Sequence, residues 1–429
     1  MSGALQAVFQ NLRGFVAKGW IGLLGGSGTD IGYAGTVDSS GNVYISGTVD
    51  SANFELAKYN KSGAIQWQRS LAIPEANGQN SVAVDSSGNT YVFGTGSDFT
   101  SLDFQVAKYN SSGSIQFQRK LGGSGSVQDF GRAVALDSSA NIYMCGKSNA
   151  SGAEDIQIAK YNSSGTIQWQ RRLGNAIACE GRGIAVDSSS NVYVVGSQFA
   201  LSPNQYNIQI AKYNSSGTIQ WQRRLSSSRN EQAYAVAVDS SANVYICGTG
   251  EDSSANDVFQ IAKYDTSGTL QWQRSLTGGT SNARAIAIDS SSNVYVCGYS
   301  TNSGTNDVQI AKYDSSGTIQ WQRRLESSSA DLGLGIAVDT SDNYYIFGRT
   351  SIGGTIDFLI AKLPQDGTST GTYTVGSYSF TYAVSTLTDA STSLTDSASS
   401  LTDASTSLTD TATTYADSAS TLTSTVGNI

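Results

Sequence analysis

The sequence contains no histidine, and this absence excludes several classes of chemistry. Histidine serves as the base of serine and cysteine nucleophile systems, as the commonest zinc ligand and as an imidazole acid–base catalyst. Charged residues are also scarce, at 14% of the chain against about 25% in an average globular protein. We therefore expect a non-enzymatic, β-rich protein whose surface is built from hydroxyl and amide groups.

Positive charge is in short supply. The chain carries 26 lysines and arginines against 34 acidic residues, a net charge of −8. Nucleic acids and anionic membranes are bound by clustered lysine and arginine, so neither is expected as the main partner. No apolar run reaches 18 residues, which argues against membrane insertion. Residues 1–19 lack the charged start and continuous apolar run of a signal peptide.

Cysteine is also infrequent, with four in the chain. Three of them, Cys145, Cys247 and Cys297, occupy the same place in different copies of a repeat. Equivalent positions in separate repeat units lie too far apart for the geometry of a disulfide. We expect buried free thiols and folding in a reducing cytoplasm.

Two short sequence units alternate along the chain, seven times each. One reads IAKYNSSGTIQWQRRL at Ile158–Leu173, and the other reads VDSSSNVYVVG at Val186–Gly196. The lysine of the first unit recurs every 49 to 52 residues, at Lys58, Lys108, Lys160, Lys212, Lys263, Lys312 and Lys362. Each unit reads as a hairpin around an Asn or Asp turn. Two hairpins per period make four strands, which is one blade of a propeller.

The tryptophans indicate how the ring closes. The aromatic residue of the fourth strand appears six times after the first period begins, at Trp67, Phe117, Trp169, Trp221, Trp272 and Trp321. The seventh is Trp20, whose surroundings match those of Trp272. We therefore predict an all-β, seven-bladed β-propeller over residues 19–370, closed by pairing of the first strand with Phe358–Leu363. The repeated tryptophan is expected to dock one blade against the next.

These repeats resemble the SBBP-type seven-bladed β-propeller repeat. The resemblance covers most of residues 20–363 and implies a binding or structural scaffold rather than a fixed activity. More loosely, the repeats are similar to those of structural proteins in tailed bacteriophages, cyanophages in particular, although a fold does not determine a function.

The two ends of the chain differ from the repeats. Residues 1–18 place apolar side chains at i, i+3 and i+4 spacing, which predicts an amphipathic helix that docks on another subunit or packs on its own domain. Residues 371–384 are expected to be a linker. Residues 385–429 repeat one large apolar residue every seven positions, at Leu387, Leu394, Leu401, Leu408, Tyr415 and Leu422. A strict heptad predicts a coiled-coil stalk that makes a homo-oligomer, for which we expect a trimer. Because Ser, Thr and Asp form helices poorly, disorder and an intertwined β-stalk are the alternatives.

The connections between hairpins point to a recognition surface. The Asp and Asn turns barely change between blades, whereas the remaining connections vary and share one face of the disc. Variable loops on a rigid scaffold are common binding sites. The candidate partner-binding residues on this face are aromatic or cationic, and their alternative role is to cover the top of the propeller: Phe99, Phe130, Phe199, Tyr206, Arg229, Tyr234 and Arg284. No cofactor and no metal site are expected.

Together these features predict a structural protein of a phage particle, assembled in the host cytoplasm, with an adhesive or assembly role. Its expected partners are other virion proteins and a host-surface glycan. The alternative is a bacterial surface module that binds a glycan or a protein through the variable face. A third possibility is a hydrolase or lyase that uses the loop carboxylates of Glu75, Glu180 or Glu231.

Overall fold

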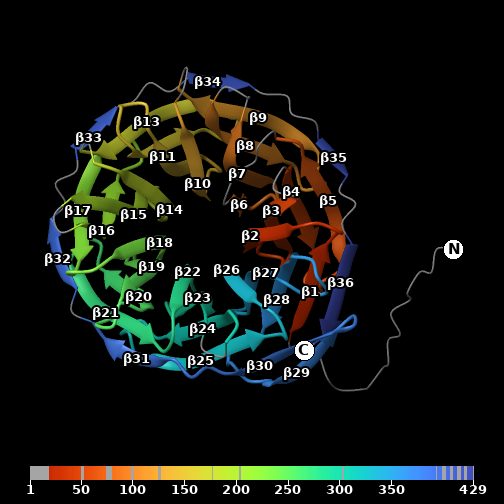
Figure 1. The fold of residues 1–429 in the computed structure, drawn as a ribbon. Helices are drawn as coiled ribbons and strands as arrows, with labels where there is room; N and C mark the ends of the chain where they lie inside the picture. Colours follow the sequence, from red (N-terminus) through yellow and green to blue (C-terminus); the bar gives the residue numbers. More distant parts are fainter. Residues whose placement is uncertain are drawn as a thin grey trace.

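A computed structural model describes most of the chain, as a closed ring of sheets arranged around a central axis (Figure 1). The described residues are 19–49, 53–73, 80–97, 101–123, 127–175, 177–201, 204–301, 304–392, 394–398, 402–405, 409–412, 417–419 and 423–428. They contain no α-helix, and so none that could span a membrane. The predicted N-terminal helix lies outside the described residues.

Each of the seven blades has four antiparallel strands that run in order from the axis to the rim. The innermost strands of blades 1 to 7 are β2 (Asp30–Val37), β6 (Ser81–Val84), β10 (Asp129–Leu136), β14 (Cys179–Val186), β18 (Glu231–Val238), β22 (Ser281–Ile288) and β26 (Asp331–Val338). The second strands are β3 (Val43–Val49), β7 (Thr90–Ser97), β11 (Ile142–Ser148), β15 (Val192–Leu201), β19 (Val244–Glu251), β23 (Val294–Ser300) and β27 (Tyr344–Thr350).

The third strands are β4 (Asn53–Tyr59), β8 (Leu102–Tyr109), β12 (Asp155–Tyr161), β16 (Asn204–Tyr213), β20 (Asp257–Tyr264), β24 (Asp307–Tyr313) and β28 (Asp357–Leu363). The fourth strands are β5 (Ile65–Leu71), β9 (Ile115–Gly122), β13 (Ile167–Gly174), β17 (Ile219–Ser226), β21 (Leu270–Thr277), β25 (Ile319–Glu326) and β1 (Trp20–Gly25). Strand β1 pairs antiparallel with β28, with Trp20 opposite Lys362 and Leu24 opposite Phe358. The predicted closure of a seven-bladed ring by the first strand is confirmed.

The repeated tryptophan joins neighbouring blades, as predicted. Trp169 on β13 of blade 3 donates its indole N–H to the Ser215 carbonyl oxygen of blade 4, at 3.1 Å. Its ring lies against Gly217, where an added Cβ would stand 2.8 Å from Trp169. Gly217 also has a φ of +78°, so glycine is required there for two reasons. The turn of each blade is thereby shaped to receive the aromatic ring of the previous one.

The Asp turns are satisfied internally. The carboxylate of Asp187 accepts hydrogen bonds from the backbone N–H groups of Ser189 and Asn191, and from the side chains of Asn191 and Tyr193. The equivalent aspartates of the other blades accept the same set, as Asp239 and Asp289 do. These residues are repeated because the turn needs them, and they are not free to act on a ligand.

The C-terminal segment is a belt around the outside of the ring, not a coiled coil (Figure 1). Residues 371–384, expected to be a linker, form the hairpin β29 (Gly371–Val375) and β30 (Tyr378–Val384), which extends blade 6. The following strands each add a fifth strand to one blade: β31 (Thr388–Ser391), β32 (Thr395–Ala398), β33 (Thr402–Ser405), β34 (Thr409–Ala412), β35 (Asp417–Ala419) and β36 (Thr423–Asn428). In chain order they pair with the fourth strands of blades 5, 4, 3, 2, 1 and 7.

The register explains the period of seven. Tyr382 lies opposite Leu325 in blade 6, Asp389 opposite Leu276 in blade 5, and Asp396 opposite Leu225 in blade 4. The series continues with position 403 opposite 173, 410 opposite 121, 417 opposite 71 and 424 opposite 24. Seven residues therefore carry the chain from one blade to the next. The seven-residue period of the sequence is therefore set by the distance between neighbouring blades at the rim. The coiled-coil prediction was wrong because a coiled coil repeats its apolar residues with the same period of seven.

The heptad leucines that are described pack on the blades. Leu387 and Leu394 are 5% and 9% exposed and belong to the cores between blades. Gln273, next to the blade-5 tryptophan, donates to the Leu394 carbonyl oxygen at 2.9 Å and accepts from its N–H at 3.1 Å. Leu387 and Leu394 are therefore not available for a stalk. The side chains of Leu401, Leu408, Tyr415 and Leu422 lie outside the described part of the chain.

Candidate functional site

The two faces of the ring differ. We call the face that carries the Asp and Asn turns the turn face, and the opposite one, where blades are connected, the variable face. The hairpin formed by β15 and β16 projects from the variable face of blade 4, because these strands have ten residues each. The corresponding strands of the other blades have seven or eight. Leu201, at the end of this hairpin, is 73% exposed.

Aromatic and amide groups gather on this projecting hairpin. The rings of Phe199 and Tyr206 meet edge to face with centroids 5.1 Å apart, and Tyr206 is 36% exposed. The Tyr206 N–H donates to the Asn230 side-chain oxygen at 3.1 Å. Asn230 in turn donates to Glu251 at 2.6 Å. The hairpin is therefore held by polar contacts while the side chains of Leu201 and Tyr206 face solvent.

The axis of the ring is a second candidate site. A cavity of about 190 Å³ lies between the innermost strands and has room for many waters, since one needs about 15 Å³. In six blades a β-bulge interrupts the register of the innermost strand, as between Gly131 and Ala133 in β10. The residue at the bulge lines the cavity: Tyr33, Arg132, Arg182, Tyr234, Arg284 and Leu334. Asn80 lines it in blade 2.

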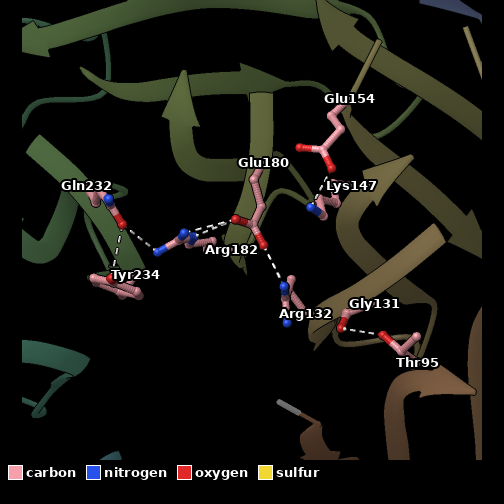
Figure 2. Close-up of polar contacts among 9 residues, drawn as sticks. All are labelled: Thr95, Gly131, Arg132, Lys147, Glu154, Glu180, Arg182, Gln232 and Tyr234. Carbon is pink, nitrogen blue, oxygen red and sulfur yellow. Dashed lines mark hydrogen bonds and ion pairs between the residues drawn. The ribbon is translucent and has the colours of Figure 1, made fainter. Parts of the chain in front are cut away.

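Small residues flank each bulge because the blades approach closely at the axis. A Cβ added to Gly131 would lie 2.5 Å from the Gly94 carbonyl oxygen of blade 2. Thr95 donates its hydroxyl to the Gly131 carbonyl oxygen at the same junction (Figure 2). A large side chain can therefore enter the axis only from the position between the two small ones.

Arginine occupies three of the bulges, and one glutamate connects two of them (Figure 2). Glu180 accepts from Arg132 at 2.7 Å through one carboxylate oxygen and from Arg182 at 2.9 Å through the other. Burial alone would raise the pKa of Glu180, but the charges of Arg182 and Arg132 hold that pKa below its ordinary value. Arg182 also donates to Gln232 at 2.9 Å, and Gln232 accepts from the Tyr234 hydroxyl.

Tyr234 lies between two guanidinium groups. The guanidinium carbon of Arg182 is 4.6 Å from the centre of its ring, and that of Arg284 is 4.1 Å away. Arg284 also donates to the Tyr299 hydroxyl at 2.8 Å. Among the described residues, Arg284 has no carboxylate partner, and its buried Nε has no hydrogen-bond partner. We call Arg132, Arg182, Arg284, Tyr234 and Glu180 the arginine cluster.

The predicted site residues are distributed over both features. Tyr234 and Arg284 belong to the arginine cluster, and Phe130 adjoins it through the Arg132 guanidinium 5.7 Å from its ring. Phe199 and Tyr206 are on the projecting hairpin, and Arg229 ties a nearby loop to the Ser253 carbonyl oxygen. Phe99 lies outside the described residues. No group of three metal-ligating side chains is found in the described part of the chain.

Residue-type reasoning missed Tyr33, Arg132, Arg182 and Leu334. Their signal is a large residue between two small ones near the start of each innermost strand, as in Gly181-Arg182-Gly183. The four cysteines are free and buried, as expected. Burial raises the pKa of the Cys179 thiol to about 12, which leaves it unreactive near neutral pH.

The comparison with protein families supports the repeat architecture. Residues 168–197 and 275–304 match the SBBP β-propeller repeat family. A protein of unknown function from Dyadobacter fermentans matches 80% of this chain and 98% of its own, at 11% identity and a TM-score of 0.46. Sqt1 from Chaetomium thermophilum matches 76% of this chain and 82% of its own, at 11% identity and a TM-score of 0.39. No curated protein matches the sequence.

Proposed function

We propose that the protein is a non-enzymatic adhesive module that binds a surface glycan through the projecting hairpin of its variable face. The observation that carries this proposal is the hairpin itself, with an exposed Leu201 and Tyr206 on a ring whose Asp turns are satisfied internally. Exposed aromatic side chains on a rigid support are frequent binding hot spots. Asn204 is also exposed on this hairpin and offers an amide donor and acceptor of the kind that sugar hydroxyls need.

The biological setting we propose is a phage particle, where the ring would be the recognition head. A bacterial surface module would use the same hairpin in the same way. Antibody labelling of purified particles tests the setting, and labelling of the host surface alone would favour the bacterial alternative.

Catalysis by the loop carboxylates receives less support. Both oxygens of Glu180 are engaged by Arg132 and Arg182. Glu231 is fully buried, and one of its carboxylate oxygens accepts from the Ser227 hydroxyl, so it is not placed to meet a substrate. Glu75 lies outside the described residues.

A glycan array probed with the full chain tests the proposal. We expect Tyr206→Ala to weaken binding to the glycans recognised by the wild type by about tenfold, because it removes the exposed ring. Val384→Ser is the matched control, since Val384 is 61% exposed but follows the rim on β30. Equal binding by wild type and Tyr206→Ala, or no glycan bound by the wild type, would contradict the proposal.

A further inference from the structure

The arginine cluster carries positive charge that the described residues do not neutralise. Its three guanidinium groups and one carboxylate leave two positive charges beside a cavity at the axis. The nearby Lys147 is paired with Glu154 at 2.6 Å and adds nothing to this balance (Figure 2). Positive charge that is partly withdrawn from water is stabilised by an anion of matching geometry.

The three arginines are held differently. Glu180 fixes Arg132 and Arg182 in place, and Gln232 holds Arg182 a second time. Arg284 is instead oriented by stacking on Tyr234 and by one hydrogen bond to Tyr299. Stacking fixes the plane of a guanidinium while leaving N–H groups at its edge to donate. Arg284 is therefore held in a fixed orientation with N–H groups available to an anionic ligand, because no described carboxylate pairs with it.

The opposite wall of the cavity is different in character. The bulges of blades 1 and 7 place Tyr33 and Leu334 there, and blade 2 contributes Asn80. Asn80 donates its amide to the Gly47 carbonyl oxygen at 2.6 Å, so it does not add charge. The cavity thus has one cationic wall and one uncharged wall.

We propose that this axial cavity is an oxyanion-binding site for a ligand that carries a carboxylate or phosphate group on an uncharged body. The oxyanion lies against Arg284 and Arg182, and the body extends toward Tyr33 and Leu334. Guanidinium groups bind carboxylate and phosphate through the same paired N–H geometry. The inference does not depend on glycan binding by the projecting hairpin, because the two sites share no residue.

Calorimetric titration of the full chain with sodium glucuronate and with inorganic phosphate tests this site. Glucose is the uncharged control, and sodium chloride at equal ionic strength controls for screening. We expect at least one of the two anions to bind and glucose not to bind. Binding of glucuronate alone assigns a carboxylate ligand, and binding of phosphate alone assigns a phosphate ester.

Two substitutions locate the binding. Arg284→Gln is expected to weaken anion affinity by about tenfold, since it removes a charged donor pair. Arg224→Gln, exposed on β17 at the rim and outside the cavity lining, should change affinity less than about twofold. If Arg284→Gln fails to fold, Arg284→Lys keeps the charge and should bind with intermediate affinity. No anion binding above chloride, or unchanged affinity in Arg284→Gln and Arg284→Lys, would overturn the proposal.

Discussion

The inner and outer edges of the ring are both sheet edges, but the outer edge is alike in all blades whereas the inner edge differs from blade to blade. At the outer edge each blade receives a fifth strand from a segment that repeats every seven residues. At the inner edge the residue at the bulge is tyrosine, arginine or leucine in six blades, and blade 2 contributes Asn80 instead. The outer edge serves the fold, because the fourth strand of every blade would otherwise expose unpaired backbone N–H and C=O groups. The varied edge is where a ligand can be distinguished.

Removal of the belt is the strongest test of this difference. A chain that ends at Val384 lacks β31 to β36, so the outer edges of the fourth strands in six blades have no pairing partner. We expect a melting temperature lower by about 10 °C or more, together with aggregation through the open edges. Calorimetry and light scattering provide the measurement, and a melting temperature equal to that of the full chain would show that the belt contributes nothing.

A single leucine of the belt should also matter. Leu394→Ala empties a buried position in the core between blades and should cost about 2–5 kcal/mol in the free energy of unfolding. Thr395→Ala is the control, because that neighbouring side chain is exposed. Urea unfolding compares the two, and similar losses would place the stabilisation in the backbone pairing alone.

Buried carboxyl groups near the start of the innermost strands predict a pH dependence. Burial raises the pKa of Asp129 and of Asp331 to about 6, and that of Glu231 to about 7. A raised carboxyl pKa favours folding below the unfolded value, near 4, and this contribution is lost as pH rises through 6 to 7. These groups should therefore make the protein more stable at pH 5 than at pH 8.

The corresponding amides check this sign. Asp129→Asn and Glu231→Gln should raise the melting temperature at pH 8 by a few degrees and flatten its pH profile. Glu180→Gln should instead lower the melting temperature at pH 8. The arginines lower the pKa of Glu180, so its stabilising contribution is present at neutral pH and is lost as pH falls. A profile that stays unchanged in the amide variants would contradict the assignment.

The belt also joins neighbouring blades through Asp389. This residue is on the blade-5 strand of the belt and accepts from the Tyr313 hydroxyl of blade 6 at 2.9 Å. Asp389→Ala and Tyr313→Phe should each cost about 1–2 kcal/mol, with a coupling of about 1 kcal/mol in the double variant. Additive losses would show that the contact does not connect the blades.

The smallest effect on stability is expected at the inner edge. Leu334→Thr changes a half-buried side chain in the cavity wall and should alter the free energy of unfolding by about 0.5 kcal/mol or less. A loss comparable with that of Leu394→Ala would mean that the inner edge also serves the fold.

Much of the ring could be predicted from sequence because its signals are local. The Asp187 turn uses side chains within six residues, and Trp20 could be matched to Trp272 by its neighbours. The belt could not be predicted in this way, since its period of seven is set by the distance between blades. That distance depends on the assembled ring and leaves no signal in neighbouring residues. Tyr234 and Arg284 were found by residue type, whereas Arg132 and Arg182 required knowing that the inner strands bulge.

The most direct test of the account compares the melting temperatures of Leu394→Ala and Arg284→Gln, each with and without the anion that the titration identifies. We predict that Leu394→Ala melts earlier but keeps the full stabilisation by the anion. Arg284→Gln should melt close to the wild type and lose that stabilisation. The reverse pattern, with ligand response lost at the belt and stability lost at the axis, would contradict the division between a structural outer edge and a binding inner edge.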